Sequence, residues 1–306
     1  VDSTAFGRKG ELAERPGYDI VVQAVSGILG SLPLVNASGV PPVVPPSIVD
    51  TTTGYAIATG VCAALFHKAM TGEGQKVETS LLVNALMIQI GGAWTFSSIP
   101  AGDAAMRQKL DELVTEARAG GTSWADLVEA RSAVMRPGAG NIYYRCYETS
   151  DGVIAIGALS RSLRSRVRSV LKVEHAIDEP GYDPPEPSQR ELDRVMTLQV
   201  EDQIRGGTND EWESSFMAGG VPVARVNFVQ EVVDHPQVRA NDYVVELEHE
   251  LTGPQYLAAP PWKMSATPPA PQGASPVLGR DTSSVLAAAG YDEQQIDALR
   301  QARVVA

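Results

Sequence analysis

The sequence contains few of the residues that build disulfide frameworks and metal centres. Its 306 residues include two cysteines and four histidines. The cysteines, Cys62 and Cys146, stand far apart and belong to none of the short Cys/His spacings that bind zinc. The sequence therefore predicts neither a disulfide scaffold nor a metal site, and we expect both cysteines to be reduced residues of the core.

An excess of positive charge is also missing. Lysine and arginine number 25 against 37 aspartates and glutamates, which gives a formal net charge of −12. Since a phosphate backbone needs a basic protein face, nucleic acid is excluded as the expected partner. No apolar run approaches the ~20 residues that span a bilayer, and residues 1–19 are too polar for a signal peptide. We expect a soluble, cytoplasmic protein without a membrane partner.

The chain is nevertheless rich enough in apolar residues for a large core. Hydrophobic residues make up 43% of it, and its length suggests about two domains. Predicted helices cover residues 51–69, 77–91, 162–173, 189–204, 209–217 and 291–302, with two more in residues 101–136 joined at Gly120-Gly121. Asp292 is the predicted cap of the last helix, and the proline-rich residues 178–187 are a predicted loop. Residues 143–147 and 153–157 form a predicted hairpin, and residues 223–226 a further strand. Residues 20–25 fit either a buried strand or the first turns of a helix.

Asp50 stands where the first of these helices begins. Four prolines between residues 41 and 46 exclude helix and central strand before it, because proline fixes φ and lacks an amide donor. Residues 51–69 then repeat apolar side chains at helical spacing, and we expect this face in the core. The glycines of Thr71-Gly72-Glu73-Gly74 end the helix.

A carboxylate at a helix start has two interpretations. The first is an N-cap, which accepts hydrogen bonds from the first-turn amides and contributes ~1 kcal/mol. The second is a nucleophile that the partial positive charge of the helix end keeps ionised. Spacing alone favours the cap, because aspartate is among the commonest capping residues.

A series of short segments carries a family resemblance. It begins with Gly17-Tyr18-Asp19-Ile20, Asp50-Thr51-Thr52-Thr53-Gly54 and the segment 71–78. It continues with residues 63–65, 80–82, 147–152, 220–226, 235–238 and 278–282. Together these segments resemble the class III coenzyme A transferases, which include formyl-CoA and carnitine-CoA transferases and have the α-methylacyl-CoA racemases as relatives. The resemblance implies an α/β fold with a large Rossmann-like domain, a small α+β domain and an interlocked dimer.

The resemblance also implies a site and a chemistry. Asp50 would be catalytic, and the implied substrate-binding or CoA-binding residues are Tyr18, Asp19, Gln23, Gly138 and Gly140. Asp50 would attack the thioester of an acyl-CoA, carry an anhydride and then a CoA thioester, and pass coenzyme A to an acceptor acid. No metal is implied. Oxyanion donors could come from the helix N-terminus after Asp50 or from a glycine-rich loop at residues 137–140.

Several of these roles have a plain structural alternative. Asp19 matches an acidic residue that transferases often carry beside the reacting groups, but a buried turn aspartate fits equally well. Gln23 could donate its amide to the site or be a satisfied core amide. Gly138 and Gly140 belong either to the glycine-rich loop or to a hinge between domains. Racemases carry histidine where Tyr18 stands, and a tyrosine with a pKa near 10 is a poor base, so the transferase branch is favoured.

The resemblance predicts the organisation of the whole chain. Residues 1–100 would form the catalytic part of the large domain, 101–136 a helical linker, 137–245 the small domain, and 246–306 a return linker with a closing helix on the large domain. No segment corresponds to the nucleotide-binding lobe with which the family fold begins. We expect a homodimer, with that lobe possibly on a second chain, because missing parallel strands would expose sheet edges.

Three other functions are alternatives to the transferase. An isomerase could move CoA within one molecule through the same aspartate, and a racemase-like enzyme remains a weaker option. A chain without the nucleotide-binding lobe could also be a non-catalytic subunit of a split transferase.

Overall fold

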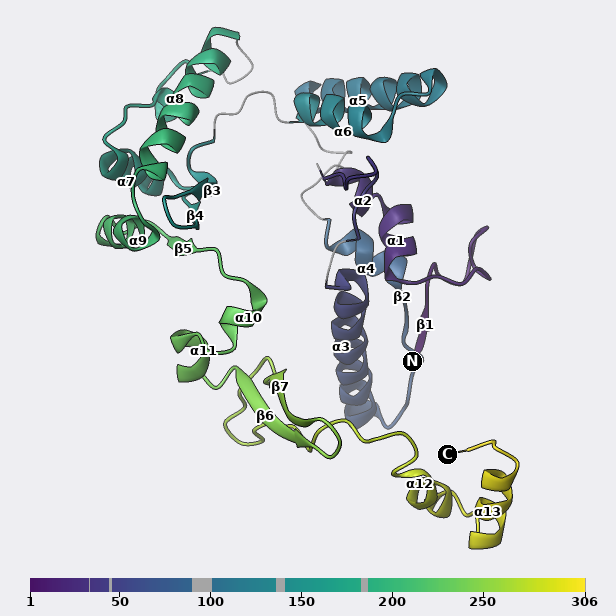
Figure 1. Ribbon diagram of the computed structural model, residues 1–306. Helices are drawn as coiled ribbons and strands as arrows, with labels where there is room; N and C mark the ends of the chain where they lie inside the picture. Colours follow the sequence, from purple (N-terminus) through teal and green to yellow (C-terminus); the bar gives the residue numbers. More distant parts are fainter. Residues whose placement is uncertain (33, 44–45, 90–100, 136–140, 183–186, 306) are drawn as a thin grey trace. The chain divides into compact units, whose positions relative to one another are not determined.

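The computed structural model describes residues 1–32, 34–43, 46–89, 101–135, 141–182 and 187–305 (Figure 1). They group into two compact units, one of residues 1–143 and 171–203, the other of residues 144–170 and 204–306. Both units combine helices with short strands, so the expected mixed α/β class is confirmed.

The first unit has its core at the start of a long helix. The helices α1 (Asp19–Ser26) and α4 (Leu81–Met87) pack against α3 (Ile48–Thr71). Each contributes one fully buried side chain to the centre of the core: Val22, Val49 and Ala85. The residues packed around them are Ala5, Phe6, Ile28, Leu81 and Leu82. Residues 20–25 are thus helical, and the short helix α2 (Ile28–Ser31) follows directly.

A parallel two-stranded sheet borders this core. The strand β1 (Asp2–Thr4) pairs with β2 (Glu78–Ser80), with Asp2 opposite Glu78. This pairing corrects the helix predicted over residues 77–91, because residues 78–80 are held in the strand and α4 begins only at Leu81. A three-residue strand has too little sequence to show alternation, so neither strand was predicted.

The helices that follow agree with the sequence patterns. Here α5 (Ala101–Gly120) and α6 (Trp124–Met135) lie side by side (Figure 1), as predicted from the break at Gly120-Gly121. Later come α7 (Arg161–Leu171), a 3-10 turn (Ala176–Asp178) and α8 (Pro187–Arg205).

The second unit contains the predicted hairpin. The strands β3 (Tyr144–Glu148) and β4 (Val153–Gly157) are antiparallel, and β5 (Val223–Arg225) adds to β4, giving the order β3-β4-β5. Ile154 and Ile156 alternate into the core, as the period of a strand requires. The helix α9 (Asn209–Ala218) begins with a capping box.

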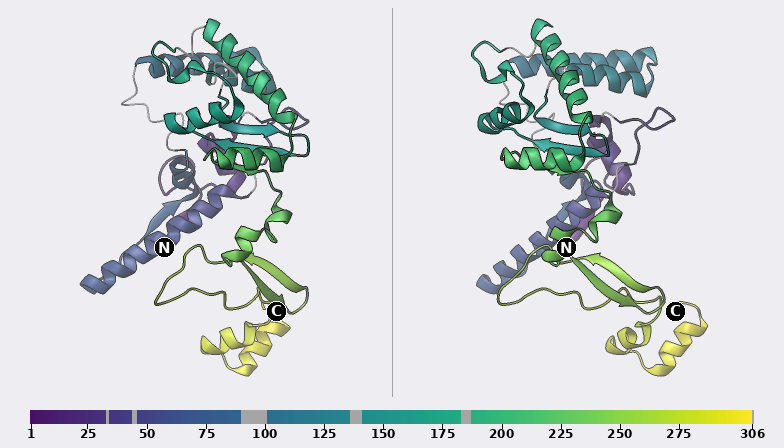
Figure 2. Two further views of the ribbon diagram at one scale, coloured as in Figure 1. Left: turned by 90° about the vertical axis from the view of Figure 1, so that its left-hand side faces the viewer. Right: turned by 60° about the vertical axis from the view of Figure 1, so that its left-hand side comes forward.

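The remainder of the second unit was predicted only in part. Its elements are α10 (Val229–Val232), α11 (Pro236–Ala240), β6 (Val244–His249), β7 (Gly253–Ala258), α12 (Thr282–Ala288) and α13 (Glu293–Gln301) (Figure 2). Asp292 caps α13 as predicted, its carboxylate accepting from the Gln295 amide at 2.9 Å. The hairpin of β6 and β7 replaces the first part of the expected linker. Pro254 fits there because each strand of a two-stranded ribbon has one edge without ladder bonds.

Most of the long helix α3 lies at the surface of its unit. Within it Val49 and Thr53 are buried, whereas Leu65, Phe66 and Met70 are 59%, 69% and 71% exposed. The expectation that its apolar face belongs to the core is therefore wrong beyond the first turns. With 24 residues α3 is also long and apolar enough to cross a membrane, which corrects the expectation that no segment reaches this length. This criterion is length and composition only, and core helices of soluble proteins meet it too.

The cysteines are likewise not core residues. Both are exposed, contrary to expectation. Cys62 lies on the uncovered part of α3, and Cys146 faces the opposite side of β3 from the buried Tyr147, because successive strand residues alternate.

Candidate active site

Asp19 begins α1 and is almost completely buried in the first unit. Two residues earlier Gly17 lies against the segment that follows β1: a Cβ atom there would come within 2.7 Å of the Ala5 Cβ. The missing side chain therefore lets the chain pass close to Ala5 as it enters α1. Asp19 is 8% exposed, and its carboxylate reaches the start of α3.

This carboxylate caps α3 from outside the helix. Its Oδ2 atom accepts hydrogen bonds from the backbone N–H groups of Val49 and Asp50, at 2.8 and 3.0 Å. Ser47 occupies the N-cap position but makes no side-chain capping bond. Asp19 thus satisfies two of the amides that a helix leaves without partners in its first turn.

Asp50 is the third residue of α3, and its side chain is exposed. Its own N–H binds Asp19, and its carboxylate makes no hydrogen bond or ion pair within the part of the chain that the structure describes. The interpretation of Asp50 as the cap is therefore wrong, because α3 begins at Ile48 and another residue caps it. The carboxylate remains in the first turn, where the helix dipole favours negative charge.

Gln23 holds the Asp19 carboxylate from the next turn of α1. Its Nε2 atom donates to Asp19 Oδ1, and the side chain is completely buried. Its Oε1 atom is buried without a hydrogen-bond partner among the described residues. Asp19 sets this orientation, since turning the amide over would place Oε1 against a carboxylate oxygen. Whether Gln23 also donates to a substrate stays a prediction.

Four of the six predicted site residues meet at these two helix starts. Tyr18 is the N-cap residue of α1, makes no side-chain capping bond and is 80% exposed. Together with Asp19 and Gln23 it lies at or near the start of α1, and Asp19 connects this start to Asp50. The remaining two, Gly138 and Gly140, lie outside the described residues.

The amides at the start of α3 are already engaged. Val49 and Asp50 donate to Asp19, and the Thr51 N–H donates to the Ser47 carbonyl at 2.9 Å. This corrects the expectation that the helix N-terminus after Asp50 supplies oxyanion donors. Such donors would have to come from another segment.

Basic side chains gather beside the β1–β2 pair, in the same unit. Arg8 and Lys9 line a shallow hollow there together with Ser80. Arg8 Nη2 and Lys76 Nζ contact the two oxygens of Asp2 at 2.5 and 3.0 Å, and these hydrogen bonds hold the pKa of the Asp2 carboxyl well below its usual value. Lys76 also pairs with Glu78, and Asp2 and Glu78 line the same hollow, so acidic and basic side chains largely balance here. Among the described residues no three His, Cys, Asp or Glu side chains cluster as a metal site would require.

A second buried carboxylate in the first unit was not predicted. Asp193 on α8 accepts from the Tyr182 hydroxyl at 2.6 Å and from Gln189 Nε2 at 2.8 Å, and it contacts His175 Nε2 at 3.0 Å. The Tyr143 hydroxyl lies 2.8 Å from His175 Nδ1. Sequence reasoning missed this cluster because Tyr182 falls in a proline-rich stretch expected to be loop. The helical spacing of Gln189 and Asp193 was the available signal.

The surroundings of Asp193 shift two pKa values. Burial alone would raise the pKa of Asp193, but the hydrogen bonds from Tyr182, Gln189 and His175 together outweigh it and lower the pKa. Burial, assisted by the hydrogen bond to Asp193, raises the pKa of Tyr182 above its ordinary value. The cluster therefore keeps an ionised carboxylate beside a protonated phenol.

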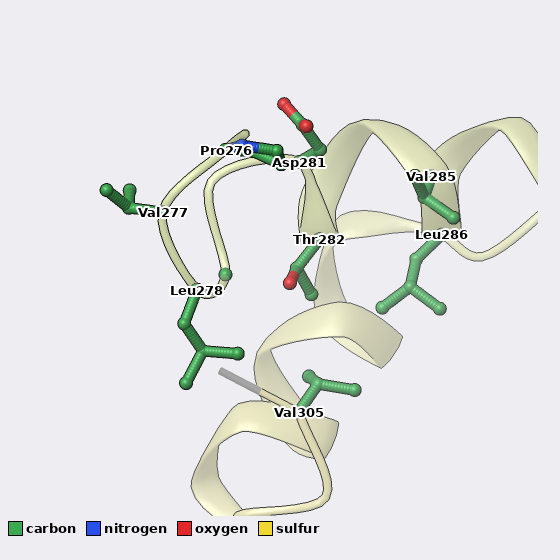
Figure 3. A pocket seen from close by; sticks show the side chains of 9 residues that line it. Pro276, Val277, Leu278, Asp281, Thr282, Val285, Leu286 and Val305 are labelled. Atoms are coloured by element: carbon green, nitrogen blue, oxygen red, sulfur yellow. The ribbon is translucent and has the colours of Figure 1, made fainter. Parts of the chain in front are cut away.

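An apolar hollow lies near the C-terminus of the second unit (Figure 3). Leu278, Leu286 and Val305 are among its lining residues. Its one charged lining residue, Asp281, pairs with Arg280 at 3.0 Å. The hollow offers apolar contact rather than a second reactive carboxylate.

Comparison with known proteins identifies the family. The model for CoA-transferase family III matches residues 1–282, so the chain belongs to CoA-transferase family III. It is 28% identical to human succinyl-CoA:glutarate CoA-transferase, covering 99% of this chain and 62% of that protein. It is 25% identical to cinnamoyl-CoA:phenyllactate CoA-transferase of Clostridium sporogenes, covering 97% of this chain and 66% of the relative. The chain thus spans less than two thirds of the length of these relatives.

Solved structures support the same fold. Rv3272 from Mycobacterium tuberculosis superposes with a TM-score of 0.64 at 19% identity, covering 92% of this chain and 67% of that one. A CaiB/BaiF family protein from Brucella suis gives a TM-score of 0.61 at 20% identity, covering 94% and 66%. At these identities the likeness shows the fold alone.

Proposed function

We propose that this chain carries the catalytic aspartate of a CoA-transferase that moves coenzyme A between an acyl-CoA and a carboxylic acid. The observation that carries the proposal is the Asp50 carboxylate, which is exposed in the first turn of α3. It does not cap the helix, because Asp19 accepts the hydrogen bonds of the first-turn amides. Membership of CoA-transferase family III and relatives named as CoA-transferases support this chemistry.

The reaction uses one carboxylate as a covalent carrier. Asp50 attacks the thioester carbonyl of the donor, the C–S bond breaks, and a mixed anhydride forms while CoA leaves as thiolate. Attack of the thiolate on the Asp50 carbonyl releases the donor acid and leaves Asp50 as a CoA thioester. The acceptor carboxylate attacks this thioester, giving a second anhydride and thiolate. The thiolate then attacks the acceptor's acyl carbon, which forms the new acyl-CoA and restores Asp50.

The names of the relatives indicate which acids to test first. The human relative is named for succinyl-CoA and glutarate, and the clostridial one for cinnamoyl-CoA and phenyllactate. A first panel of substrates therefore pairs succinyl-CoA with glutarate and cinnamoyl-CoA with phenyllactate. Arg8 and Lys9 beside the β1–β2 pair are candidates for contact with an anionic group of the substrate.

One experiment separates the transferase from its alternatives. The protein is incubated with each acyl-CoA, with and without the acceptor acid, and the mass of the peptide containing Asp50 is measured. A CoA adduct together with exchange between two acids is the expected result. An adduct with rearranged acyl-CoA and no external acceptor would indicate the isomerase. Absence of both adduct and exchange would contradict the proposal and favour the non-catalytic subunit.

The racemase alternative has less support. Tyr18 stands at the position where the resembling racemases carry histidine, and a phenol is a weak base at neutral pH. We therefore expect no exchange of the α-proton of a 2-methylacyl-CoA with deuterated solvent at a rate comparable to thioester exchange.

We further propose a homodimer as the working assembly. The exposed apolar side chains of α3, Leu65, Phe66 and Met70, support this proposal, since soluble proteins rarely leave such contiguous patches uncovered. Light scattering at low concentration is expected to return a dimer. A folded monomer with an unchanged melting point would contradict the assembly.

A further inference from the structure

We propose that Asp19 is a positioning residue for the reaction at Asp50: by capping α3 from another helix, it fixes the first turn and leaves the Asp50 carboxylate unengaged. This inference rests on the proposed function. It assigns Asp19 a role that acts through Asp50 rather than through contact with the substrate.

The hydrogen bonds couple Asp19 directly to the backbone of the nucleophile. A single oxygen, Oδ2, accepts from Val49 and from Asp50 itself, at 2.8 and 3.0 Å. The other oxygen, Oδ1, accepts from Gln23. Held at both oxygens, the carboxylate has no freedom to rotate. Charge-assisted bonds of this kind are about twice as strong as neutral ones.

Burial makes the arrangement specific. Asp19 is 8% exposed, and Gln23 and Val49 are completely buried, so solvent competes little for these bonds. The Val49 and Asp50 amides would still need an acceptor if Asp19 were removed. Asp50 lies in the same first turn and is itself an acid, so its carboxylate would be drawn toward them. A nucleophile that folds back to cap its own helix no longer points toward the substrate.

The consequence is a loss of rate rather than of binding. Displacing a reacting group by about 1 Å costs roughly 10²-fold in rate. We expect Asp19→Ala to lower the rate constant of Asp50–CoA adduct formation by about 10²-fold. Asp19→Asn keeps one oxygen for the two amides, and Gln23 can turn its Oε1 toward the new NH₂ group. We expect its loss to be smaller, about 10-fold.

The test is a single-turnover measurement in the full protein with saturating succinyl-CoA, or with cinnamoyl-CoA if that is the donor that labels Asp50. Amplitude reports the fraction of competent protein, and the rate constant reports the geometry at Asp50. A control is Asp292→Ala, which also removes an aspartate cap, although Asp292 caps its own helix α13 rather than a different one. We expect Asp292→Ala to leave the rate constant unchanged, because it lies outside the family match of residues 1–282.

The outcomes separate this inference from the proposed function. A wild-type rate constant in Asp19→Ala, even with reduced amplitude, would show that Asp19 only supports the fold and would overturn the inference alone. Should Asp19→Ala fail to fold, the rate constant of Asp19→Asn decides in the same way. Absence of an adduct in the wild-type protein with every donor of the panel would overturn both.

Discussion

Asp19 and Asp193 are two buried aspartates of the same unit, and each holds a glutamine four residues away on its own helix. Their remaining partners differ. Asp193 accepts from the side chains of Tyr182 and His175, which form a closed cluster. Asp19 accepts from backbone amides at the start of a helix, one of which belongs to the exposed Asp50.

This difference shows that burial of a carboxylate does not by itself mark a site. Around Asp193 the hydrogen bonds end in side chains that support one another, so the carboxylate stabilises the local fold. Around Asp19 they reach the backbone of Asp50, whose side chain is exposed and makes no hydrogen bond or ion pair within the described part of the chain. Hydrogen bonds to a buried carboxylate therefore stabilise the local fold at Asp193, whereas at Asp19 we propose that they position the Asp50 carboxylate.

The largest expected effect is that of replacing Asp50, the residue that Asp19 is proposed to position. Asp50→Asn removes the carboxylate nucleophile, and we expect CoA transfer to fall by on the order of 10³-fold or more. Because the Asp50 side chain is exposed and makes no described contact, the unfolding free energy should change by less than ~0.5 kcal/mol. Steady-state exchange and urea unfolding measure the two quantities.

A matched control for Asp50→Asn is Glu293→Gln, which neutralises another exposed acid in the first turn of a helix. We expect it to retain full activity. Near-normal transfer by Asp50→Asn would show that Asp50 is not the nucleophile. Asp19 would then have no nucleophile to position, and its proposed difference from Asp193 would no longer hold.

Replacing Asp193 is expected to lower stability and to leave the rate constant unchanged, the opposite of what we expect for Asp50. Asp193→Ala leaves the partly buried donors of Tyr182, Gln189 and His175 without this acceptor, which should lower the unfolding free energy by ~3 kcal/mol. At a temperature where the variant is folded, the rate constant of adduct formation should equal that of the wild type. A rate loss as large as that expected for Asp19→Ala would erase the distinction between them.

Much of the secondary structure followed from local sequence. The break at Gly120-Gly121 separates α5 from α6, and the Asp292 cap begins α13 as predicted. Gly72 ends α3 in the left-handed conformation, with φ of 80°, which glycine adopts without strain. Such signals act over a few residues, so a single sequence is sufficient to find them.

The relations that define the site are of longer range. The Asp19–Asp50 hydrogen bond joins residues 31 positions apart, and no periodicity connects a helix cap to a different helix. For the same reason the pairing of β1 with β2 and the cluster around Asp193 were missed. The exposure of α3 could not be predicted either, because an apolar pattern does not show whether other segments cover the helix. The division into large domain, linker, small domain and return linker, and the cytoplasmic location, stay predictions.

The smallest expected effect is the pH dependence of stability around Asp193. Hydrogen bonds lower its pKa in the folded protein below the ~3.9 of an unfolded chain, so the unfolded state binds the proton first as pH falls. The stabilisation is present above pH ~4 and is lost as pH drops through the folded pKa. Tyr182 acts in the opposite direction: its raised pKa stabilises the fold below pH ~10, and this is lost at higher pH.

Two conservative variants test these limbs. Between pH 3 and 5 the unfolding free energy of Asp193→Asn should depend less on pH than that of the wild type, by at most ~1.4 kcal/mol per pH unit, the value for one proton. Tyr182→Phe should flatten the alkaline limb, and it should also weaken the acidic limb in part, because it removes one of the hydrogen bonds that lower the pKa of Asp193. Parallel curves for Asp193→Asn and the wild type would mean that the hydrogen bonds of the Asp193 cluster do not favour an ionised carboxylate in the folded protein.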